Sequence, residues 1–236
     1  MNDFKAETPE PDSSPEQRPA IELSASARPL DGNGGDLVWS DHQTDTRAWL
    51  LIADAMGHDA PANLAADRLR DLIADNLADS PKTVIETVND KFLDAYRGKD
   101  TGMFVTGLLL LIDLNVQQVR VCNFGHHGLL TARHGLVKIK SGVPVGMLAD
   151  AAPWPEAILD TETIGERGMV FTDGLIEQFN PEGQMYTLDR LAETFSDTLE
   201  MPLPESIERI FQSLDEFRNG AAQTDDQALL GFELLK

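Results

Sequence analysis

The sequence predicts one layered α+β domain, in which two β-sheets pack face to face and helices cover their outer faces. Two observations predict this arrangement. Strand-like apolar segments form separate blocks along the chain, and two pairs of segments with helical spacing are interleaved with those blocks. The chain has 236 residues, enough for one large domain, and shows no break in composition near its middle.

The first part of the chain begins with a polar segment. Residues 1–19 are rich in Pro, Glu, Asp and Ser and lack apolar periodicity, so we expect a disordered acidic tail there and a folded domain over residues 20–236. Strands are expected at 21–28, 37–40 and 48–53, with a glycine-rich loop at 29–35. One helix should begin near Pro61; a second should have Ser80 as its N-cap and end at Gly98.

The second part of the chain is dense in strands. The strands are expected at 103–113, 118–123, 128–132, 136–139, 158–164 and 169–172, with a closing strand at 227–235. Helices are expected at 187–199 and 204–218, because their apolar residues recur every three or four positions. Short turns containing Asn or Gly join several of the strands.

Charge and composition exclude several classes of partner. The 40 acidic and 19 basic residues give a formal charge of −21, which argues against binding nucleic acid or an anionic membrane and is compatible with cations or basic partners. The single cysteine, Cys122, lies in an apolar strand and is expected to be a core residue. No secretory signal is visible, and the longest apolar stretch is too short to span a bilayer, so we expect a cytoplasmic protein.

Aspartates at the ends of apolar segments carry the clearest functional signal. They are Asp36 after two glycines, Asp54 after residues 50–53, Asp173 after residues 169–172, and the Asp225-Asp226 pair before the closing strand. Aspartate is common at turns, but several such strand ends brought together would form an all-oxygen pocket. Hard divalent cations such as Mg²⁺ and Mn²⁺ prefer that ligand set.

Seven short motifs follow one another in a recognisable order. They are Gly34-Gly35-Asp36, Asp54-Ala55-Met56-Gly57-His58, Phe104-Val105-Thr106, Asn123-Phe124-Gly125-His126, Gly142-Val143-Pro144-Val145-Gly146, Thr172-Asp173-Gly174-Leu175-Ile176-Glu177 and Asp225-Asp226. Each motif is weak by itself. Their order and spacing over residues 20–236 resemble the SpoIIE/RsbU-type serine phosphatases, a bacterial branch of the metal-dependent protein phosphatase (PPM) superfamily.

The resemblance implies an αββα sandwich of two antiparallel sheets flanked by helix pairs, and a centre of two Mn²⁺ or Mg²⁺ ions. The residues implied as catalytic metal ligands are Asp36, Asp54, Asp173 and Asp225, with the backbone carbonyl of Ala55 as a further ligand. The aspartate doublet leaves a one-residue ambiguity between Asp225 and Asp226, and Asp225 is favoured. The loops of the site would include Gly35, Gly57, His58, Asp59 and Gly174.

Some residues depart from the family pattern or have two interpretations. Asp59 stands where family members commonly have a glycine, so it either alters the turn or adds a carboxylate to the site. Trp39 stands where an acidic residue is often found. His58 either orders the entry to a helix or acts as a general acid, whereas His126 and His127 are expected to be structural.

The expected function is that of a Mn²⁺- or Mg²⁺-dependent protein serine/threonine phosphatase, in which a metal-activated water attacks the phosphate. By resemblance, the substrate is the phosphoserine of an anti-sigma-factor antagonist with a STAS-type domain, in a partner-switching pathway. The alternative is a non-catalytic partner-binding module, which only Asp59 favours. A calcium-stabilised domain is weaker still, because no EF-hand-like spacing is present.

Regulation is expected from the helix pair of residues 61–98, which begins just after the loop that follows Asp54. In the resembled family this pair acts as a switch for the metal site. Activity is then expected to be weak in isolation and to rise when a partner, or a second copy in a homodimer, pins the helices. The alternative is that these helices only have a fixed packing role.

Overall fold

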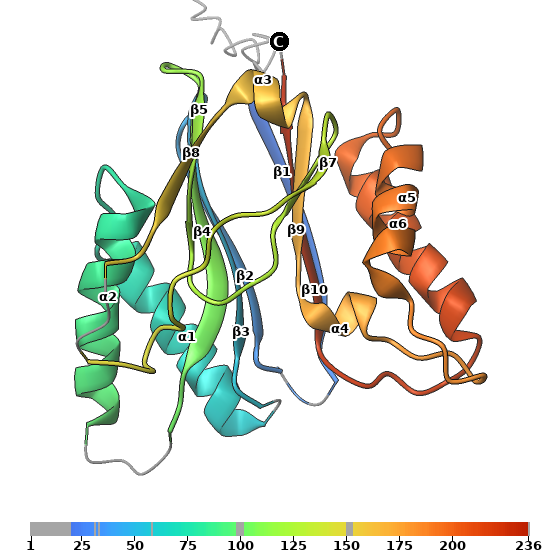
Figure 1. Ribbon diagram of the computed structural model, residues 1–236, viewed down its shortest axis with the longest axis horizontal. Helices are drawn as coiled ribbons and strands as arrows, with labels where there is room; N and C mark the ends of the chain where they lie inside the picture. Colours follow the sequence, from blue (N-terminus) through green and yellow to red (C-terminus); the bar gives the residue numbers. More distant parts are fainter. Residues whose placement is uncertain are drawn as a thin grey trace, which may run out of the picture.

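The computed structural model describes residues 20–30, 32, 34–57, 59–97, 102–149 and 153–235. Two five-stranded antiparallel sheets stack face to face, with one helix pair on each outer side (Figure 1). The predicted α+β sandwich is therefore confirmed. The expected tail at 1–19, together with His58 and Gly98, lies outside the described residues.

Sheet A contains, in spatial order, β1 (Ile21–Arg28), β10 (Gln227–Leu234), β9 (Arg167–Phe171), β6 (Leu129–Thr131) and β7 (Gly135–Val137). Sheet B contains β2 (Asp36–Thr44), β3 (Arg47–Ala55), β4 (Val105–Asp113), β5 (Gln118–Asn123) and β8 (Glu156–Asp160). The first and last strands of the described chain are thus neighbours, and β10 lies between β1 and β9.

Strand β3 shows how the sequence produces the layers. Trp49 and Leu51 pack toward the helices, whereas Leu50 and Ile52 pack toward sheet A. Both faces are buried, which explains the unbroken apolar run, because successive side chains of a strand point to opposite faces. The same alternation places Asp54 on the face between the two sheets.

The helices are α1 (Ala60–Ala74), α2 (Pro81–Tyr96), α3 (Thr161–Ile164), α4 (Asp173–Ile176), α5 (Thr187–Asp197) and α6 (Leu203–Arg218). Helices α1 and α2 cover sheet B, and α5 and α6 cover sheet A (Figure 1). The predicted start of α2 is confirmed, since the Ser80 side chain accepts a hydrogen bond from the Thr83 amide. Ser80 also donates to Glu156 of β8 (2.5 Å), which ties this end of α2 to the edge of sheet B.

One local prediction needs correction, and one short helix was missed. The strand expected at 158–164 ends at Asp160, and residues 161–164 form the short helix α3, because the chain turns there from sheet B to sheet A. Helix α4 was not predicted, since four residues are too few to show a helical period. Cys122 is buried in the core as expected, and burial raises the pKa of its thiol to about 12. No helix of the described residues is long and apolar enough to cross a membrane.

Candidate active site

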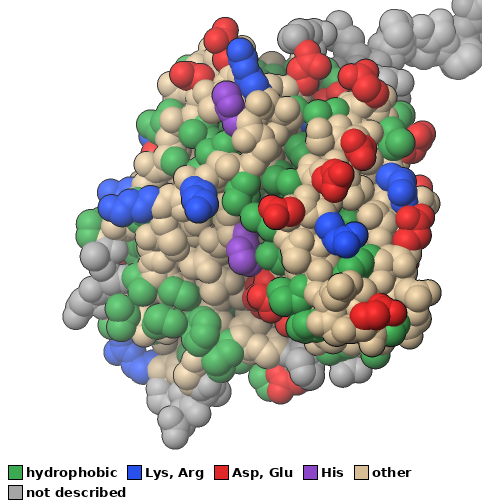
Figure 2. All heavy atoms as spheres, turned by 45° about the vertical axis from the view of Figure 1, so that its right-hand side comes forward, with side chains coloured by type: hydrophobic (Ala, Val, Ile, Leu, Met, Phe, Trp, Pro, Cys, Tyr) green, Lys and Arg blue, Asp and Glu red, His purple; other side chains and the backbone are tan. Residues whose placement is uncertain are grey.

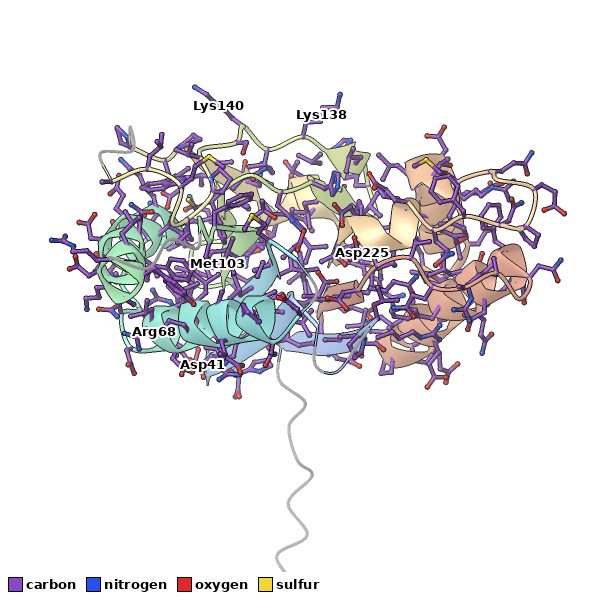
Figure 3. All side chains as sticks on the ribbon, turned by 90° about the horizontal axis from the view of Figure 1, so that it is seen from below. Asp41, Arg68, Met103, Lys138, Lys140 and Asp225 are labelled. Carbon is purple, nitrogen blue, oxygen red and sulfur yellow. The ribbon has the colours of Figure 1, made fainter. Side chains whose placement is uncertain are left out.

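The predicted metal-binding aspartates lie at one edge of the sandwich, and both sheets contribute to them. In sheet B, Asp36 begins β2 and is the direct cross-strand partner of Asp54 at the end of β3. In sheet A, Asp173 follows β9 as the first residue of α4, and Asp225 precedes the neighbouring strand β10. In Figure 3, seen from this edge, Asp225 lies between the two helical layers, whereas Lys138 and Lys140 project away from the body.

The carboxylates are close enough to change one another's ionisation. Burial raises the pKa of Asp36 to about 8; the Thr172 hydrogen bond opposes this rise, and the charges of Asp54, Asp226 and Asp173 add to it. Burial likewise raises the pKa of Asp54 to about 7, with further contributions from Asp173, Asp225 and Asp226. Mutual repulsion of this kind is expected where carboxylates gather without a cation.

Glycines allow the turns of the site to approach one another. A side chain at Gly35 would collide with the carbonyl oxygens of Gly57 and Ala55, and one at Gly174 would collide with the backbone of Asp226. Gly57 has φ of +93°, a conformation that other residues rarely adopt. The Ala55 amide donates to the Gly35 carbonyl (3.1 Å), which joins the loop before β2 to the end of β3.

Asp59 has a structural explanation. It is the N-cap of α1, where its carboxylate accepts a hydrogen bond from the Ala62 amide (3.3 Å). A carboxylate in this position satisfies an otherwise unpaired amide and complements the helix dipole. His58, the neighbouring residue of the predicted loop, is outside the part of the chain that the structure describes.

The two members of the aspartate doublet lie in different surroundings. Asp226 is 3% exposed, and its two carboxylate oxygens accept hydrogen bonds from the amides of Leu30 and Gly35, each at 2.6 Å. Asp225 is exposed, and its Oδ1 accepts a hydrogen bond from the Asp226 amide (2.8 Å). The geometry therefore favours Asp225 as a ligand, because the Asp226 carboxylate already fastens the loop before Asp36.

The sequence analysis assigned no role in the site to two polar residues near the aspartates. Thr172 was noted only as part of the Thr-Asp-Gly motif, and its hydroxyl donates to Asp36 (2.6 Å). His126 was expected to be structural, and its Nε2 is 3.0 Å from the carbonyl oxygen of Phe171. Burial, followed by the charge of His127, lowers the pKa of His126 to about 4, so the ring is neutral and Nε2 donates to that carbonyl. Both contacts fix the segment that leads into Asp173.

The donor set at this edge suits a hard divalent cation, since it consists of carboxylate oxygens and a nearby backbone carbonyl. Among the described residues, no three Asp, Glu, His or Cys side chains are already close enough together to hold an ion. The carboxylates would have to converge on a cation, whose charge would also offset the burial and the neighbouring carboxylates that raise the pKa values of Asp36 and Asp54. The types of ligand atom present therefore fit Mn²⁺ or Mg²⁺.

The larger grooves of the molecule lie elsewhere. A groove of about 770 Å³ is lined by Leu114, Arg167 and Leu235 at the opposite end of the sandwich, where β10 ends (Figure 1). Acidic side chains are scattered over the surface shown in Figure 2. The candidate site is therefore located by its carboxylates, and not by a large groove.

Comparisons with known proteins agree with this arrangement. The profile of the family described as Stage II sporulation protein E (SpoIIE) matches residues 44–235. The fold is similar to the SiaA-PP2C domain of Pseudomonas aeruginosa, with a TM-score of 0.78 and 18% identity over 89% of this chain and 85% of that chain. It is also similar to the PP2C phosphatase domain of SpoIIE with a fragment of its regulatory domain from Bacillus subtilis (TM-score 0.70, 15% identity, 91% of this chain and 64% of that chain).

A third similar structure is the catalytic domain of the serine threonine protein phosphatase PstP in complex with two manganese ions (TM-score 0.66, 14% identity, 92% of this chain and 99% of that chain). A comparison with curated protein sequences gave no significant match. At these identities the structural likeness shows the fold, and the profile match over most of the chain shows the family. The chain therefore belongs to the SpoIIE family, and its enzyme class is that of a metal-dependent phosphoprotein phosphatase.

Proposed function

We propose that this phosphatase hydrolyses phosphoserine or phosphothreonine in a protein substrate, with two Mn²⁺ or Mg²⁺ ions held by this chain's carboxylates. The proposed ligands are Asp36, Asp54, Asp173 and Asp225, with the backbone carbonyl of Ala55. One observation carries the proposal: Asp36 and Asp54 face each other across β2 and β3, and Asp173 and Asp225 come to the same edge of the sandwich from sheet A. Such a cluster needs a cation to be stable in its ionised form.

The chemistry divides between the ions and the chain. When bound, the cations would neutralise the phosphoryl oxygens and supply a water acidic enough to attack phosphorus. The chain positions the carboxylates: β-pairing fixes Asp36 against Asp54, and the turn into α4 presents Asp173. Asp225 is exposed, so a phosphorylated side chain can approach this edge from solvent. No protein nucleophile is needed for this reaction.

The proposed substrate is a phosphorylated STAS-type anti-sigma-factor antagonist in a partner-switching pathway in the cytoplasm. The family match supports this proposal, as does a structural likeness to the RsbU and RsbW domains of a Mycobacterium tuberculosis protein (TM-score 0.66, 17% identity). The charge of −21 agrees with a protein substrate and disfavours nucleic acid. We also propose that a partner or a second copy of the chain raises activity by pinning α1 and α2.

The competing proposal is a non-catalytic partner-binding module with the phosphatase fold. Only Asp59 favoured this module in the sequence, and the structure explains Asp59 as the N-cap of α1. A binding module would also have no need for Asp36 and Asp54 on the face between the sheets, where burial and neighbouring carboxylates disfavour their charged forms in the metal-free fold. Catalysis is the better explanation of these residues.

The test is the hydrolysis of p-nitrophenyl phosphate and of a phosphoserine peptide by the purified chain, with Mn²⁺ and with EDTA. Turnover should require Mn²⁺, and equal rates in EDTA would refute a metal-dependent reaction. Asp54→Asn and Asp173→Asn should each slow turnover at least about 100-fold, roughly 2.7 kcal/mol of transition-state stabilisation. Asp41→Asn is the matched control, because Asp41 lies further along β2 and pairs with Trp49. Near wild-type rates for both site variants would place the site elsewhere.

A further inference from the structure

The hydroxyl group of Thr172 connects the two sheets at the site. Its side chain is fully buried, and its Oγ1 lies 2.8 Å from the Ala228 amide of β10 and 2.6 Å from Oδ2 of Asp36 in β2. The amide can only donate, so the hydroxyl oxygen accepts that bond and its own proton is available for the carboxylate. The carbonyl of Ala228 is a more distant alternative acceptor at 3.4 Å. Thr172 therefore gives Asp36 a short hydrogen bond from the opposite sheet.

The segment that carries this hydroxyl is itself held in place. The Thr172 amide donates to the Ala228 carbonyl (3.0 Å), and the preceding carbonyl, of Phe171, accepts a hydrogen bond from His126. A donor with a fixed backbone loses little freedom when it orients a neighbouring carboxylate.

We propose that Thr172 is a positioning residue for the metal centre, which orients the Asp36 carboxylate from the opposite sheet. This inference rests on the proposed function, since it assumes that Asp36 is a ligand. Partners of metal ligands typically change metal affinity by about 10–100-fold when they are removed. The simpler explanation is that Thr172 only completes the pairing of β9 with β10 by accepting the Ala228 amide.

Three variants of the full chain separate these explanations. Thr172→Val keeps the shape of the side chain and removes the hydroxyl, and Thr172→Ser keeps the hydroxyl. Thr131→Val is the matched control: Thr131 is also buried in sheet A, donates to the Gly135 carbonyl (3.2 Å) and accepts from the His134 amide (3.1 Å). Both valine variants should lower the melting temperature, because each leaves a backbone amide unpaired.

The deciding measurement is Mn²⁺ affinity by isothermal titration calorimetry without substrate. Thr172→Val should weaken Mn²⁺ binding about 10–100-fold, whereas Thr172→Ser and Thr131→Val should bind like the wild type. The Mn²⁺ concentration for half-maximal activity should rise in parallel for Thr172→Val, and KM for the phosphopeptide should stay unchanged at saturating Mn²⁺. Wild-type affinity in Thr172→Val would overturn the positioning role.

A further variant keeps the test decisive if Thr172→Val does not fold. Thr172→Cys has a similar size and a weaker donor, so its Mn²⁺ affinity should fall below that of Thr172→Ser. Equal affinities in these two variants would refute the inference. If the wild type binds no Mn²⁺, the proposed function itself fails; if the wild type binds and all variants match it, only the role of Thr172 fails.

Discussion

Raising the pH should destabilise the metal-free protein, because two partly buried aspartates hold protons that the unfolded chain releases. Burial raises the pKa of Asp36 from 3.8 to about 8 and that of Asp54 from 3.8 to about 7. Between 3.8 and these values the folded state binds more protons than the unfolded state, so the free energy of unfolding falls as pH rises. His126, with a pKa lowered from 6.5 to about 4, acts oppositely below about pH 6.5. Above about pH 6.5, the change in the free energy of unfolding with pH is therefore due mainly to Asp36 and Asp54.

The size of the effect follows from the same values. Between about pH 6.5 and 8, Asp36 should contribute a loss of about 2 kcal/mol and Asp54 a loss of about 1 kcal/mol. Together, a loss of about 2–3 kcal/mol corresponds to a fall in melting temperature of about 4–12 °C for a chain of this length. Bound Mn²⁺ should remove the loss, since a cation at the site takes the place of the protons.

Thermal unfolding followed by circular dichroism measures this directly, with one series of buffers containing EDTA and another containing Mn²⁺. Asp36→Asn removes the larger titration, so its metal-free melting temperature should vary less with pH. Asp41→Asn should leave the wild-type dependence unchanged. If the wild-type melting temperature in EDTA is constant or rises between these pH values, Asp36 and Asp54 do not hold extra protons in the folded state.

The remaining predictions concern single residues and the helix pair. Asp225→Asn should abolish most Mn²⁺-dependent turnover and leave the metal-free melting temperature nearly unchanged. Asp226→Asn should lower that melting temperature, because the variant loses one of the two hydrogen bonds from backbone amides, worth about 1–3 kcal/mol. The reverse result would make Asp226 the ligand. Asp59→Ala should lower the free energy of unfolding in urea by about 1 kcal/mol, because the N-cap of α1 is lost. Asp59→Asn should lower it little, and both variants should retain turnover. Loss of turnover in both would give Asp59 a role in the site. If α1 and α2 form a switch, Mn²⁺ affinity measured by calorimetry should tighten with protein concentration or added partner, and independence from both would make these helices a fixed scaffold.

Local patterns were sufficient to predict most of the fold and the positions of the acidic residues. The run from Trp49 to Ala53 is apolar because β3 is buried on both faces, and the same burial ends where Asp54 begins the site. Ser80 and Pro81 gave the start of α2 because capping depends on a few neighbouring residues. The placement of Asp36 beside Asp54 could be expected from two adjacent strands, and β-pairing provides it.

The roles of Thr172 and Asp226 could not be predicted in this way. Their partners are far away in sequence: the Thr172 bond to Asp36 spans 136 positions, and the bonds from Asp226 to the amides of Gly35 and Leu30 span 191 and 196. A pattern of nearby residues does not determine which distant backbone amide a carboxylate will meet. The sequence alone therefore does not decide between Asp225 and Asp226, because the contacts that distinguish them depend on how distant segments pack.

The distance between these partners along the chain has a consequence for the order in which the enzyme is made. Strand β10 lies between β1 and β9, so β1 cannot join sheet A until residues 227–234 have left the ribosome. Asp225 emerges just before that strand, long after Asp36 and Asp54. Contacts of such long range form late in folding. A nascent chain that has not yet added β10 should therefore be inert toward phosphoproteins, and the first appearance of Mn²⁺ binding should report that the last strand has been inserted.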